Sequence, residues 1–392
     1  MTPESQAVPR DKVDDYTEAG AARRRAFARD HTGVDLHDVG AYSIDPHSVA
    51  GNIENFTGVA QVPLGLAGPI RVNGEHAQGN FYVPLATTEG TLVASYNRGM
   101  RLVSACGGVK ATVVEQFMQR APVFLLPDAV AARDFGAWIR DQFAEIKQAA
   151  EQTTRIGKLD HIEQYQVGPA RFLRFNFTTG DAAGQNMCGK ATAAACQWIR
   201  AHWPGRLEYL LSGNIDTDKK HSVINTLHTR GRRVVAEIVL RADLLREYMG
   251  VSPGEFFRWR QIQTAGAFMV GSASNGPQVA NAIAALFIAT GQDAADVSES
   301  QAAITYTQLL DSGNYYWSVT LPSLIVATCG GGTALPTQRQ CLELLGCFGT
   351  GKADKLAEIC AAVALAGDVS LASAVIHGDW VSSHERFGRN RP

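Results

Sequence analysis

Residues 79–106, GNFYVPLATTEGTLVASYNRGMRLVSAC, contain the change of pattern that decides the fold of this chain. The stretch GNFYVPLATT predicts a strand, and the following residues predict a helix over 90–106. Apolar residues recur in that helix at helical spacing, at Leu92, Val93, Tyr96, Met100 and Val103. We therefore expect a strand that leads directly into a helix with one buried face, with the polar segment TTEG (87–90) at the joint.

Composition limits the possible classes of function. The chain has 392 residues and a formal net charge of −2, so we expect about two or three domains and no nucleic-acid partner. Its seven cysteines contain no Cys-x-x-Cys pair and lie mostly among apolar or small residues, as in a reducing cytoplasm. The polar N-terminus lacks a signal core, and the most apolar helical stretch, 281–290, is shorter than the about 20 residues that cross a bilayer. We expect a cytoplasmic protein without a membrane partner.

Changes of pattern along the chain predict its organisation. Residues 1–47 are charged and indicate a helical N-terminal arm, in which Arg23-Arg24-Arg25 either attract an anion or form a solvated helix face. Gly- and Pro-punctuated strands follow from about residue 50. Residues 122–210 predict a separate small α+β unit, with helices over 128–152 and 186–202 and strands over 165–178 and 207–212. A strand over 233–240, further helices and an Ala-rich helix from about Ala353 complete the larger unit.

Three charged stretches far apart in the sequence carry the candidate chemistry. They are TTEG at 87–90, DTDKK at 216–220 and GQD at 291–293. Two carboxylates and a lysine in one pocket can polarise a carbonyl and pass it a proton, which makes Glu89, Lys219 and Asp293 candidate catalytic residues. His384, close to the C-terminus, adds a titratable acid. Together these residues indicate an enzyme that acts on a carbonyl.

Each stretch also has an interpretation without catalysis. Glu89 and its threonines can cap a helix, whereas a proton donor at this position needs shielding from water that raises its pKa. Lys219 can belong to a charged surface turn or lie at a strand end that faces a cleft, where its charge stabilises an alkoxide. Asp293 follows an apolar helix, whose C-terminus disfavours a carboxylate, and pairing with a buried lysine would explain its position.

Glycine-rich segments are candidate ligand loops. GDAAGQN (180–186) leads into a helix whose N–H groups could hold phosphate, although no Gly-x-Gly-x-x-Gly triad follows a strand. GGGT (330–333) allows close approach to a ligand or forms a flexible turn. Arg171 and Arg174 lie on opposite faces of a predicted strand, so we expect one of them to point at a ligand. Histidine spacing predicts no metal site, and no Gly-x-Ser-x-Gly elbow indicates a serine hydrolase.

Several of these segments occur in the order found in one family. ENFTGVAQVPLGLAGPI, VPLATTEGTLVASYNRG, SGNIDTDKK, TGQDAA, LPSLIVATCGGGT and VSSHE resemble the signature blocks of 3-hydroxy-3-methylglutaryl-CoA (HMG-CoA) reductase, and the chain is similar to a class I form without a membrane anchor. The resemblance implies an α+β fold in which a large mixed α/β substrate-binding domain (48–121 and 211–375) carries an inserted small ferredoxin-like cofactor domain (122–210). A C-terminal flap (376–392) with His384 completes it.

The resemblance also implies an activity in isoprenoid biosynthesis and a set of roles. An acyl-CoA thioester, HMG-CoA by default, is reduced to mevalonate by two hydrides from NADPH, through a hemithioacetal and an aldehyde. Lys219 would stabilise the oxyanion, Glu89 would donate the proton, Asp293 would couple the two, and His384 would protonate the CoA thiolate. The implied substrate-binding residues are Arg120, Ser212, Asn214, Asp218, Lys220 and Asn281. The implied cofactor-binding residues are Arg171, Phe172, Asp181, Gly184, Asn186, Gly330 and Gly331, and Arg171 favours NADP over NAD. A homodimer or homotetramer with active sites between subunits is implied.

The chain departs from the family pattern around the substrate. The family's lysine falls here among residues 261–263 (QIQ), with Arg258 and Arg260 out of register, and its histidine position is Gln278. DAAGQNM replaces DAMGMNM, and Val297 replaces an asparagine. Loss of a cation beside a buried carboxylate costs on the order of 3 kcal/mol. The same chemistry on a related acyl thioester is therefore an alternative, and a non-catalytic member of the family is another.

Overall fold

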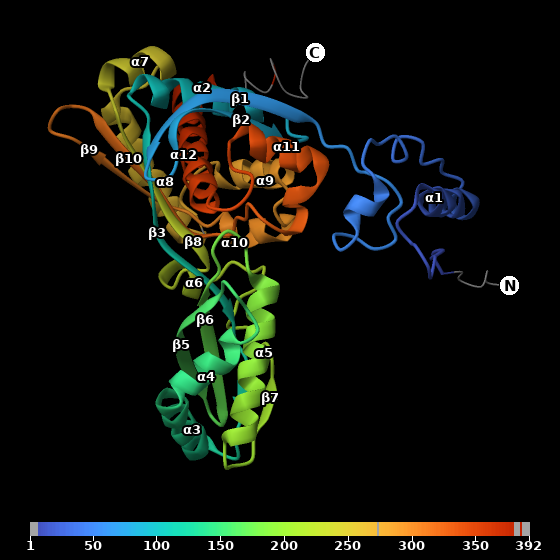
Figure 1. Cartoon of the computed structure of the whole chain (residues 1–392). Coiled ribbons are helices and arrows are strands. Elements are labelled where there is room, and N and C mark those ends of the chain that lie inside the picture. The colour runs from blue at the N-terminus through green and yellow to red at the C-terminus, as the bar shows by residue number, and fades with distance from the viewer. Residues whose placement is uncertain (1–6, 273, 380–384, 386–392) are drawn as a thin grey trace.

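One long strand connects the two main parts of the molecule in the computed structural model, which describes residues 7–272, 274–379 and 385. This strand is β3 (Val109–Arg120). Its first part pairs with β1 (Leu64–Gly74) and β8 (Gly231–Leu240), and its last residues pair with β6 (Ala170–Thr178). Figure 1 shows the large part at the top, the narrow unit below it and the N-terminal arm at the side. The fold is a mixed α+β fold.

The sheet of the large part is mainly antiparallel. Its order is β2 (Gln78–Ala86), β1, β3, β8, β10 (Tyr315–Leu324) and β9 (Ile304–Leu309), and only β1 and β3 run parallel. The helices α2 (Leu92–Ala105), α9 (Val279–Thr290) and α12 (Ala353–His377) pack together and against these strands. The predicted strand-to-helix joint is confirmed, because β2 ends at Ala86 and α2 begins at Leu92. Further helices complete this part of the chain: α6 (Val223–Leu227), α7 (Ala242–Met249), α8 (Pro253–Met269), α10 (Val297–Ser300) and α11 (Pro336–Leu344).

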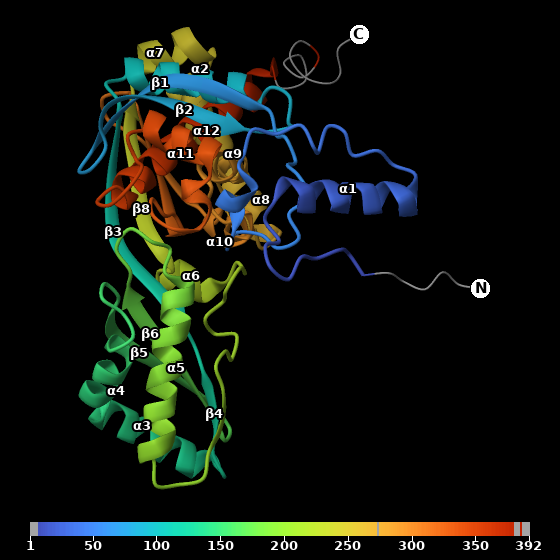
Figure 2. The same cartoon turned by 45° about the vertical axis from the view of Figure 1, so that its right-hand side comes forward.

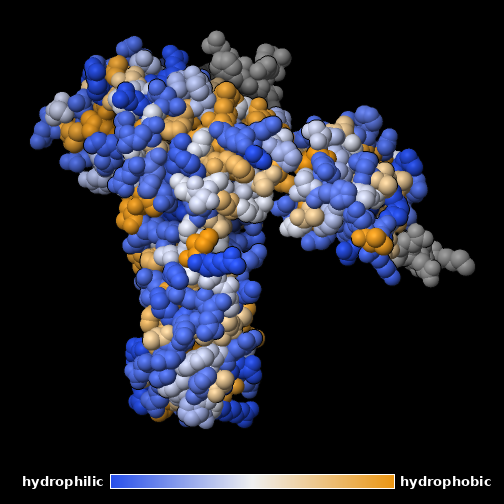
Figure 3. Space-filling view, in the orientation of Figure 1, coloured by the Kyte–Doolittle hydropathy of each residue, from blue (hydrophilic) through white to orange (hydrophobic). Residues whose placement is uncertain are grey.

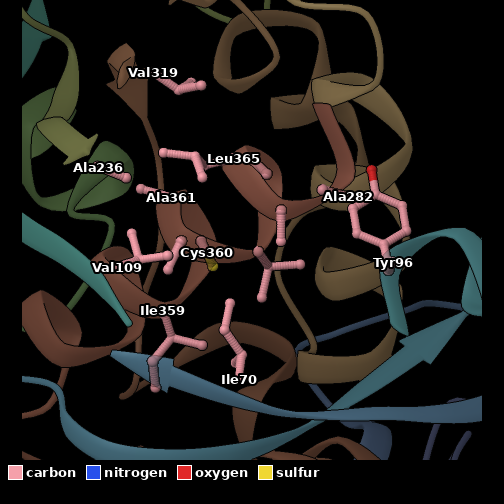
Figure 4. Packing of buried hydrophobic residues seen from close by; sticks show 14 of the residues in the cluster. Ile70, Tyr96, Val109, Ala236, Ala282, Val319, Ile359, Cys360, Ala361 and Leu365 are labelled. Carbon is pink, nitrogen blue, oxygen red and sulfur yellow. The ribbon is translucent and has the colours of Figure 1, made fainter. Parts of the chain in front are cut away.

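The helix α12 lies in the centre of the large part (Figure 1). Its residues Ile359, Cys360, Ala361 and Leu365 pack among Ile70, Val109, Ala236 and Val319 of the sheet, as Figure 4 shows. The helix is long and apolar enough to cross a membrane, whereas the expectation considered only the shorter stretch 281–290. Since 83% of its apolar window is buried inside the molecule, α12 has the surroundings of a core helix.

The narrow unit has a core of its own. Its strands β5 (Lys158–Val167), β6, β4 (Val123–Leu125) and β7 (Glu208–Leu210) lie in that order, and all neighbours are antiparallel. The helices α3 (Ala129–Asp141), α4 (Phe143–Glu151) and α5 (Gln185–His202) pack on the face that carries Leu173, Phe175 and Phe177. The elements thus follow the order β-α-β-β-α-β, with the first helical segment divided between α3 and α4.

Two predicted elements of this unit differ from the structure. The helix predicted over 128–152 is broken at Gln142, where α3 ends and α4 begins. The strand predicted over 165–178 is the second half of a hairpin, whose turn contains Gly168 with φ of 54°. The alternation in 158–167 is half-buried on both faces, and this weak contrast explains why the strand was missed.

The N-terminal arm contains α1 (Glu18–Thr32) and the short helix η1 (Pro46–Val49), and it projects away from the large part (Figure 2). The arginine run is not a uniform solvated face. Arg24 is buried, pairs with Asp15 and donates to the Phe56 carbonyl over 2.8 Å. Arg25 donates to Glu18 (2.6 Å) and to the Thr57 carbonyl (2.8 Å). These two arginines therefore hold α1 against the segment that follows it.

Candidate active site

Lys219 and Asp293 meet in the structure, although 73 residues of chain lie between them. The distance from Lys219 Nζ to Asp293 Oδ2 is 2.7 Å, and both side chains are a little under half exposed. The hydrogen bond that Lys219 donates to Asp293 is the largest cause that raises the pKa of Lys219. Burial raises the pKa of Asp293, but the bonds from Lys219 and from the Ala295 N–H outweigh it and lower that pKa. The two groups stabilise each other in their charged forms.

The reason for the position of Asp293 differs from the predicted one. The helix α9 ends at Thr290 and its C-cap is Gly291, with φ of 70°. Asp293 is the N-cap of the next short helix, η2 (Ala294–Asp296), and accepts the Ala295 N–H over 3.0 Å. A carboxylate is favourable at a helix N-terminus, so the predicted conflict with the end of α9 does not arise.

The turn that carries Lys219 has an unusual backbone. Asn214, Thr217 and Lys219 all adopt positive φ, at 68°, 58° and 56°. Side chains with a Cβ rarely do so, and such residues concentrate at functional sites. The Thr217 hydroxyl donates to Asn225 Oδ1 (2.9 Å), and the Lys219 backbone N–H donates to Glu299 Oε1 (2.5 Å). Buried partners therefore hold the turn in this conformation.

A network of ion pairs lies beneath the turn. Arg120 contacts Asp216 at 2.8 Å and Asp218 at 3.5 Å, and Arg230 contacts Asp218 at 2.9 Å. Arg230 also donates to Glu299 at 2.7 Å, and both of these side chains are fully buried. Burial raises the pKa of Glu299 to about 7, against the effect of Arg230. Arg230 and Glu299 were missed as site residues, because nothing in their local sequence distinguishes them from ordinary charged positions. Asp216 belongs to the DTDKK stretch but was given no role of its own.

The predicted substrate-binding residues divide between this turn and the start of α9. Ser212 donates to Asp216 Oδ2 (3.0 Å), and Lys220 Nζ donates to the Asp218 carbonyl (3.0 Å). Asn281 is the third residue of α9 and is half-buried. Arg120 and Asp218 are engaged with each other, so their charges organise the turn.

Glu89 is exposed in the single chain. The N-cap of α2 is Thr91, with φ of 71° and no side-chain cap bond among the described residues, and the Glu89 N–H donates to Thr87 Oγ1 over 3.0 Å. Within the described residues, its side chain makes no hydrogen bond or ion pair with Lys219 or Asp293. The shielding expected of a proton donor is therefore not supplied by the single chain. His384 lies outside the described residues.

Substitution of the family's lysine and histidine leaves a buried polar group. Gln278 donates its N–H to Asp368 Oδ1 (2.7 Å) and accepts from the Tyr96 hydroxyl (2.6 Å). Burial raises the pKa of Asp368 to about 7. Arg260 is buried, lies over the Trp317 ring and donates to the Asn275 carbonyl (2.6 Å). Its guanidinium therefore belongs to the core and does not replace the family's lysine.

The predicted cofactor loops come together next to the Lys219–Asp293 pair. The Asp181 carbonyl accepts the Thr328 N–H (3.0 Å), which joins the turn at 180–186 to the loop at 329–332. A Cβ on Gly291 would lie 2.3 Å from the Gly332 carbonyl, so this loop also packs closely on the segment that carries Asp293. Gln185, at the start of α5, donates to both oxygens of Asp296, at 3.0 and 3.1 Å.

Several features of these loops suit a phosphate-bearing ligand. Gly184 begins α5 with φ of 81°, and among the described residues no side chain caps that helix N-terminus. Asn186 is exposed in its first turn. Added Cβ atoms on Gly330 and Gly331 would meet nothing within 4 Å in the described structure. Unpaired N–H groups at a helix N-terminus and open glycines form a surface on which phosphate can bind.

Asp181 and Arg171 do not have the predicted roles in this conformation. The Asp181 carboxylate accepts three backbone N–H groups at the start of α12, from Gly351, Lys352 and Ala353, at 2.8 to 3.1 Å. Arg171 donates to Gln164 and Gln166, and its guanidinium packs on Gly136 of α3. Arg171 lies seven residues before the end of β6, roughly 23 Å along the strand from the turn at 180–186. It is therefore not beside this phosphate site.

Phe172 and Arg174 lie on the opposite face of β6 from Arg171, as predicted. Phe172 lies against Gly213, where an added Cβ would be 2.8 Å from its ring. Arg174 is buried and pairs with Glu163 at 3.0 Å.

Two acidic groups of the described residues have the spacing of metal ligands, Asp218/Asp296/Glu299 and Glu75/His76/Glu358. Arg230 and Gln185 already engage the first group, and backbone N–H groups engage Glu358 in the second.

Comparisons with known proteins agree with this arrangement. The family model of hydroxymethylglutaryl-coenzyme A reductase matches residues 20–389. The chain is 42% identical to the 3-hydroxy-3-methylglutaryl-coenzyme A reductase of Aeropyrum pernix over 374 residues, which cover 93% of this chain and 89% of the relative. It is 41% identical to that of Methanocaldococcus jannaschii, covering 93% and 92%. The reductase structure from Streptococcus pneumoniae has a TM-score of 0.69 at 20% identity, covering 90% of this chain and 96% of that one, and so shares the fold. The chain belongs to the hydroxymethylglutaryl-coenzyme A reductase family.

Proposed function

We propose that this protein reduces HMG-CoA to mevalonate with NADPH, through a hemithioacetal and an aldehyde. The observation that carries the proposal is the Lys219–Asp293 ion pair of 2.7 Å beside two open, glycine-containing loops. Relatives at about 40% identity over nearly the whole chain carry the reductase name, which supports the same reaction here. NADPH would supply the two hydrides of the reaction.

Lys219 would act on the substrate carbonyl at both reduction steps. Its ammonium is held by Asp293, whose carboxylate raises the pKa of Lys219, so the lysine stays protonated at neutral pH. A fixed positive charge at the carbonyl oxygen stabilises the alkoxide that develops there. We propose Glu89 as the proton donor and His384 as the acid that protonates the CoA thiolate. The other predicted residues of the turn at 212–220, with Arg120 and Asn281, would hold the acyl part.

The two-part architecture supports a division of labour. We propose that the narrow unit, 122–210, is a ferredoxin-like cofactor domain inserted in the substrate-binding domain, with 1–47 as an arm and 376–392 as a flap. Gly184, Asn186, Gly330 and Gly331 would hold the phosphates. Asp181 would act by fixing its turn to α12, since its oxygens are already occupied. A Streptococcus pneumoniae reductase of class II bound to NADPH shares the fold and supports the cofactor.

We also propose that the active site is completed by residues of two subunits. We expect the protein to be cytoplasmic. Glu89 is exposed in the single chain, and a proton donor needs a drier setting to act near neutral pH. Phe268, Met269 and Val270 at the end of α8 are 87%, 83% and 78% exposed, which is unusual for three consecutive apolar residues. A second copy of the chain could cover both features, as in a homodimer or homotetramer.

The test is a direct assay of the purified protein. With NADPH and HMG-CoA we expect loss of NADPH absorbance together with release of one free thiol for every two NADPH consumed. NADH replaces NADPH in a parallel reaction, which measures the cofactor preference that Arg171 no longer explains. If neither absorbance loss nor thiol release occurs, the proposed reaction is wrong.

A related acyl-CoA thioester is the second candidate substrate. It is favoured by the group around Gln278, where the family's histidine is absent and Arg260 is turned into the core. A free substrate carboxylate would then lack a cation contributed from this region. Kinetics with HMG-CoA and with acyl-CoA thioesters that lack the carboxylate separate the two candidates. If kcat/KM is higher for the thioesters whose acyl group lacks a carboxylate, HMG-CoA is not the preferred substrate.

A further inference from the structure

The turn that carries Lys219 rests on a buried glutamate that was not among the predicted site residues. Glu299 lies in α10 and its side chain is fully buried. Its Oε1 accepts the Lys219 backbone N–H over 2.5 Å. Its Oε2 accepts from Arg230 Nε over 2.7 Å and from Asn225 Nδ2 over 3.4 Å. Each oxygen of this carboxylate therefore has a distinct task, one toward the turn and one toward the buried side chains beneath it.

The backbone of Lys219 needs such support. Its φ of 56° lies in the left-handed region, where the Cβ of an ordinary residue crowds the following carbonyl. A residue keeps this conformation only when its surroundings impose it. Glu299 imposes it directly through the amide, and Asn225 joins Glu299 to the hydroxyl of Thr217, another residue of the turn with positive φ.

The charges around Glu299 show that it is not simply a partner for Arg230. Arg230 also contacts Asp218 at 2.9 Å and donates to the Gln119 carbonyl at 3.2 Å, so it has partners of its own. Asp218 and Asp296 are the other acids close to Glu299, and Lys219 is the neighbouring lysine. Placing the Glu299 carboxylate close to two other carboxylates costs free energy. Its Oε1 nevertheless accepts the Lys219 amide. This arrangement is explained if the position of Lys219 depends on it.

We propose that Glu299 is a positioning residue for Lys219. The glutamate holds the lysine backbone from beneath, and Asp293 holds the ammonium at the other end of the side chain, 2.7 Å away. Both ends of the lysine, its backbone amide and its ammonium, are thereby held in place. This inference rests on the proposed role of Lys219 in stabilising the alkoxide.

Replacement of Glu299 by leucine removes the acceptor for the Lys219 amide and puts an apolar side chain of similar size in its place. Misplacement of a catalytic group by about 1 Å lowers rates by about 100-fold, so we expect E299L to lose kcat by about that factor. KM for the thioester and for NADPH should change by less than about threefold, because ground-state binding is largely kept. Lys219 acts on both carbonyls, so kcat should fall equally with the thioester and with the free aldehyde.

Glu299→Gln is the conservative variant, since its amide oxygen can still accept the Lys219 N–H. We expect its kcat to be at least about tenfold higher than that of E299L and still below wild type, a partial rescue consistent with a positioning role. Glu343→Leu is the matched control, because Glu343 is a partly exposed glutamate of α11 that pairs only with Arg339 among the described residues, and its kcat should equal wild type. If circular dichroism shows that E299L does not fold, E299Q becomes the test of the proposal. We then expect the kcat of E299Q to be about fivefold or more below wild type, with KM unchanged.

The outcomes separate this inference from the proposed function. An inactive wild type overturns the proposed function. An active wild type with an inactive Lys219→Ala and a fully active E299L overturns the positioning role alone. The same conclusion follows if E299L raises KM but leaves kcat unchanged, or if the aldehyde reaction is unaffected.

Discussion

The strained backbone of Lys219 and the ion pair at its tip are two halves of one arrangement. The backbone is held by Glu299, and the ammonium is held by Asp293. Sequence reasoning found the pair at the tip, because the charges of DKK and GQD complement each other. It did not find the support beneath the turn, because buried partners such as Arg230 and Asn225 are brought there by other elements.

At this scale, Lys219→Ala should remove the charge that stabilises the developing alkoxide. Loss of a donor of this kind lowers kcat by about 100- to 1000-fold, and the complete loss of a cation should reach at least that range. The free energy of unfolding should change by less than about 1 kcal/mol, since the ion pair is partly exposed. NADPH consumption and thermal unfolding measure the two effects. Lys158→Ala, which removes an exposed lysine of β5, is the control, and equal losses in both variants would contradict the role of Lys219.

Glu163 gives the narrow unit a dependence on acid pH. It contacts Arg174 at 3.0 Å and His228 at 2.7 Å, with His161 at 3.7 Å and Tyr165 also facing it. Burial raises the pKa of Glu163, but these cationic partners outweigh it and lower the pKa from 4.5 to about 2. Because the folded pKa lies below the unfolded one, the stabilisation is present above about pH 4.5 and is lost as pH falls toward 2.

We therefore expect Glu163→Gln to be destabilised by on the order of 3 kcal/mol near neutral pH, and by much less near pH 2. Denaturant unfolding across this pH range measures the difference between variant and wild type. Glu145→Gln, at an exposed position of α4, should show no such trend. A difference that stays constant from neutral pH to pH 2 would show that ionisation of Glu163 is not its source.

At the scale of elements, α2 and α12 cross in close contact within the core. A Cβ added to Gly99 of α2 would lie 1.9 Å from the Ala366 carbonyl oxygen, and one added to Gly367 of α12 would lie 2.2 Å from the Tyr96 ring. The small residues thus allow two core helices to approach backbone to backbone. The predicted apolar stripe of α2 is confirmed at Leu92, Tyr96, Met100 and Val103, which are all buried.

Gly99→Ala should consequently be destabilising, although alanine is the better helix former. Overpacking of a core costs about 1–3 kcal/mol, and the backbone oxygen at this site can relieve the contact only if a helix shifts. Thermal unfolding measures the loss. Gly266→Ala in α8 is the matched control, because an added Cβ there meets nothing within 4 Å in the described structure, and it should stabilise by about 0.5–1 kcal/mol. A Gly99→Ala variant as stable as wild type would contradict this packing.

At the scale of the whole molecule, the exposed apolar residues are the surface on which we expect the proposed second copy to bind. In Figure 3, hydrophobic residues form small separate groups on a mostly hydrophilic face. The run Phe268, Met269 and Val270 is far more exposed than is normal for consecutive apolar residues. Burial of each such side chain contributes about 1.5–3 kcal/mol, so the run can stabilise a subunit contact substantially.

Phe268→Glu should weaken self-association, because a charge would be buried in an apolar contact. We expect the wild type to be a dimer or tetramer and the variant to dissociate at concentrations at least about tenfold higher. Sedimentation velocity over a concentration series measures the shift. Val167→Glu, at an exposed position beside the β5–β6 turn, should leave association unchanged. A monomeric wild type, or equal behaviour of both variants, would place the contact elsewhere.

Local sequence determined much of this protein by itself. The helical spacing at 92–103 specifies α2 because its apolar residues form one buried face, and the apolar run at 81–86 specifies β2, which is buried over 83–86. The motifs TTEG, DKK and GQD identified the family and the candidate lysine and carboxylates. These properties are local, so they can be seen in short segments of chain.

Tertiary structure alone decided how those segments work together. Packing placed Asp293 at the start of η2 against Lys219, turned Arg171 away from the position expected of it, held Arg260 in the core, and engaged Asp181 with α12. It also buried Glu299 and Arg230 beneath the turn that carries Lys219. Each of these outcomes depends on which elements meet in space, and such meetings are set by burial and hydrogen bonding across distant segments that no local pattern encodes.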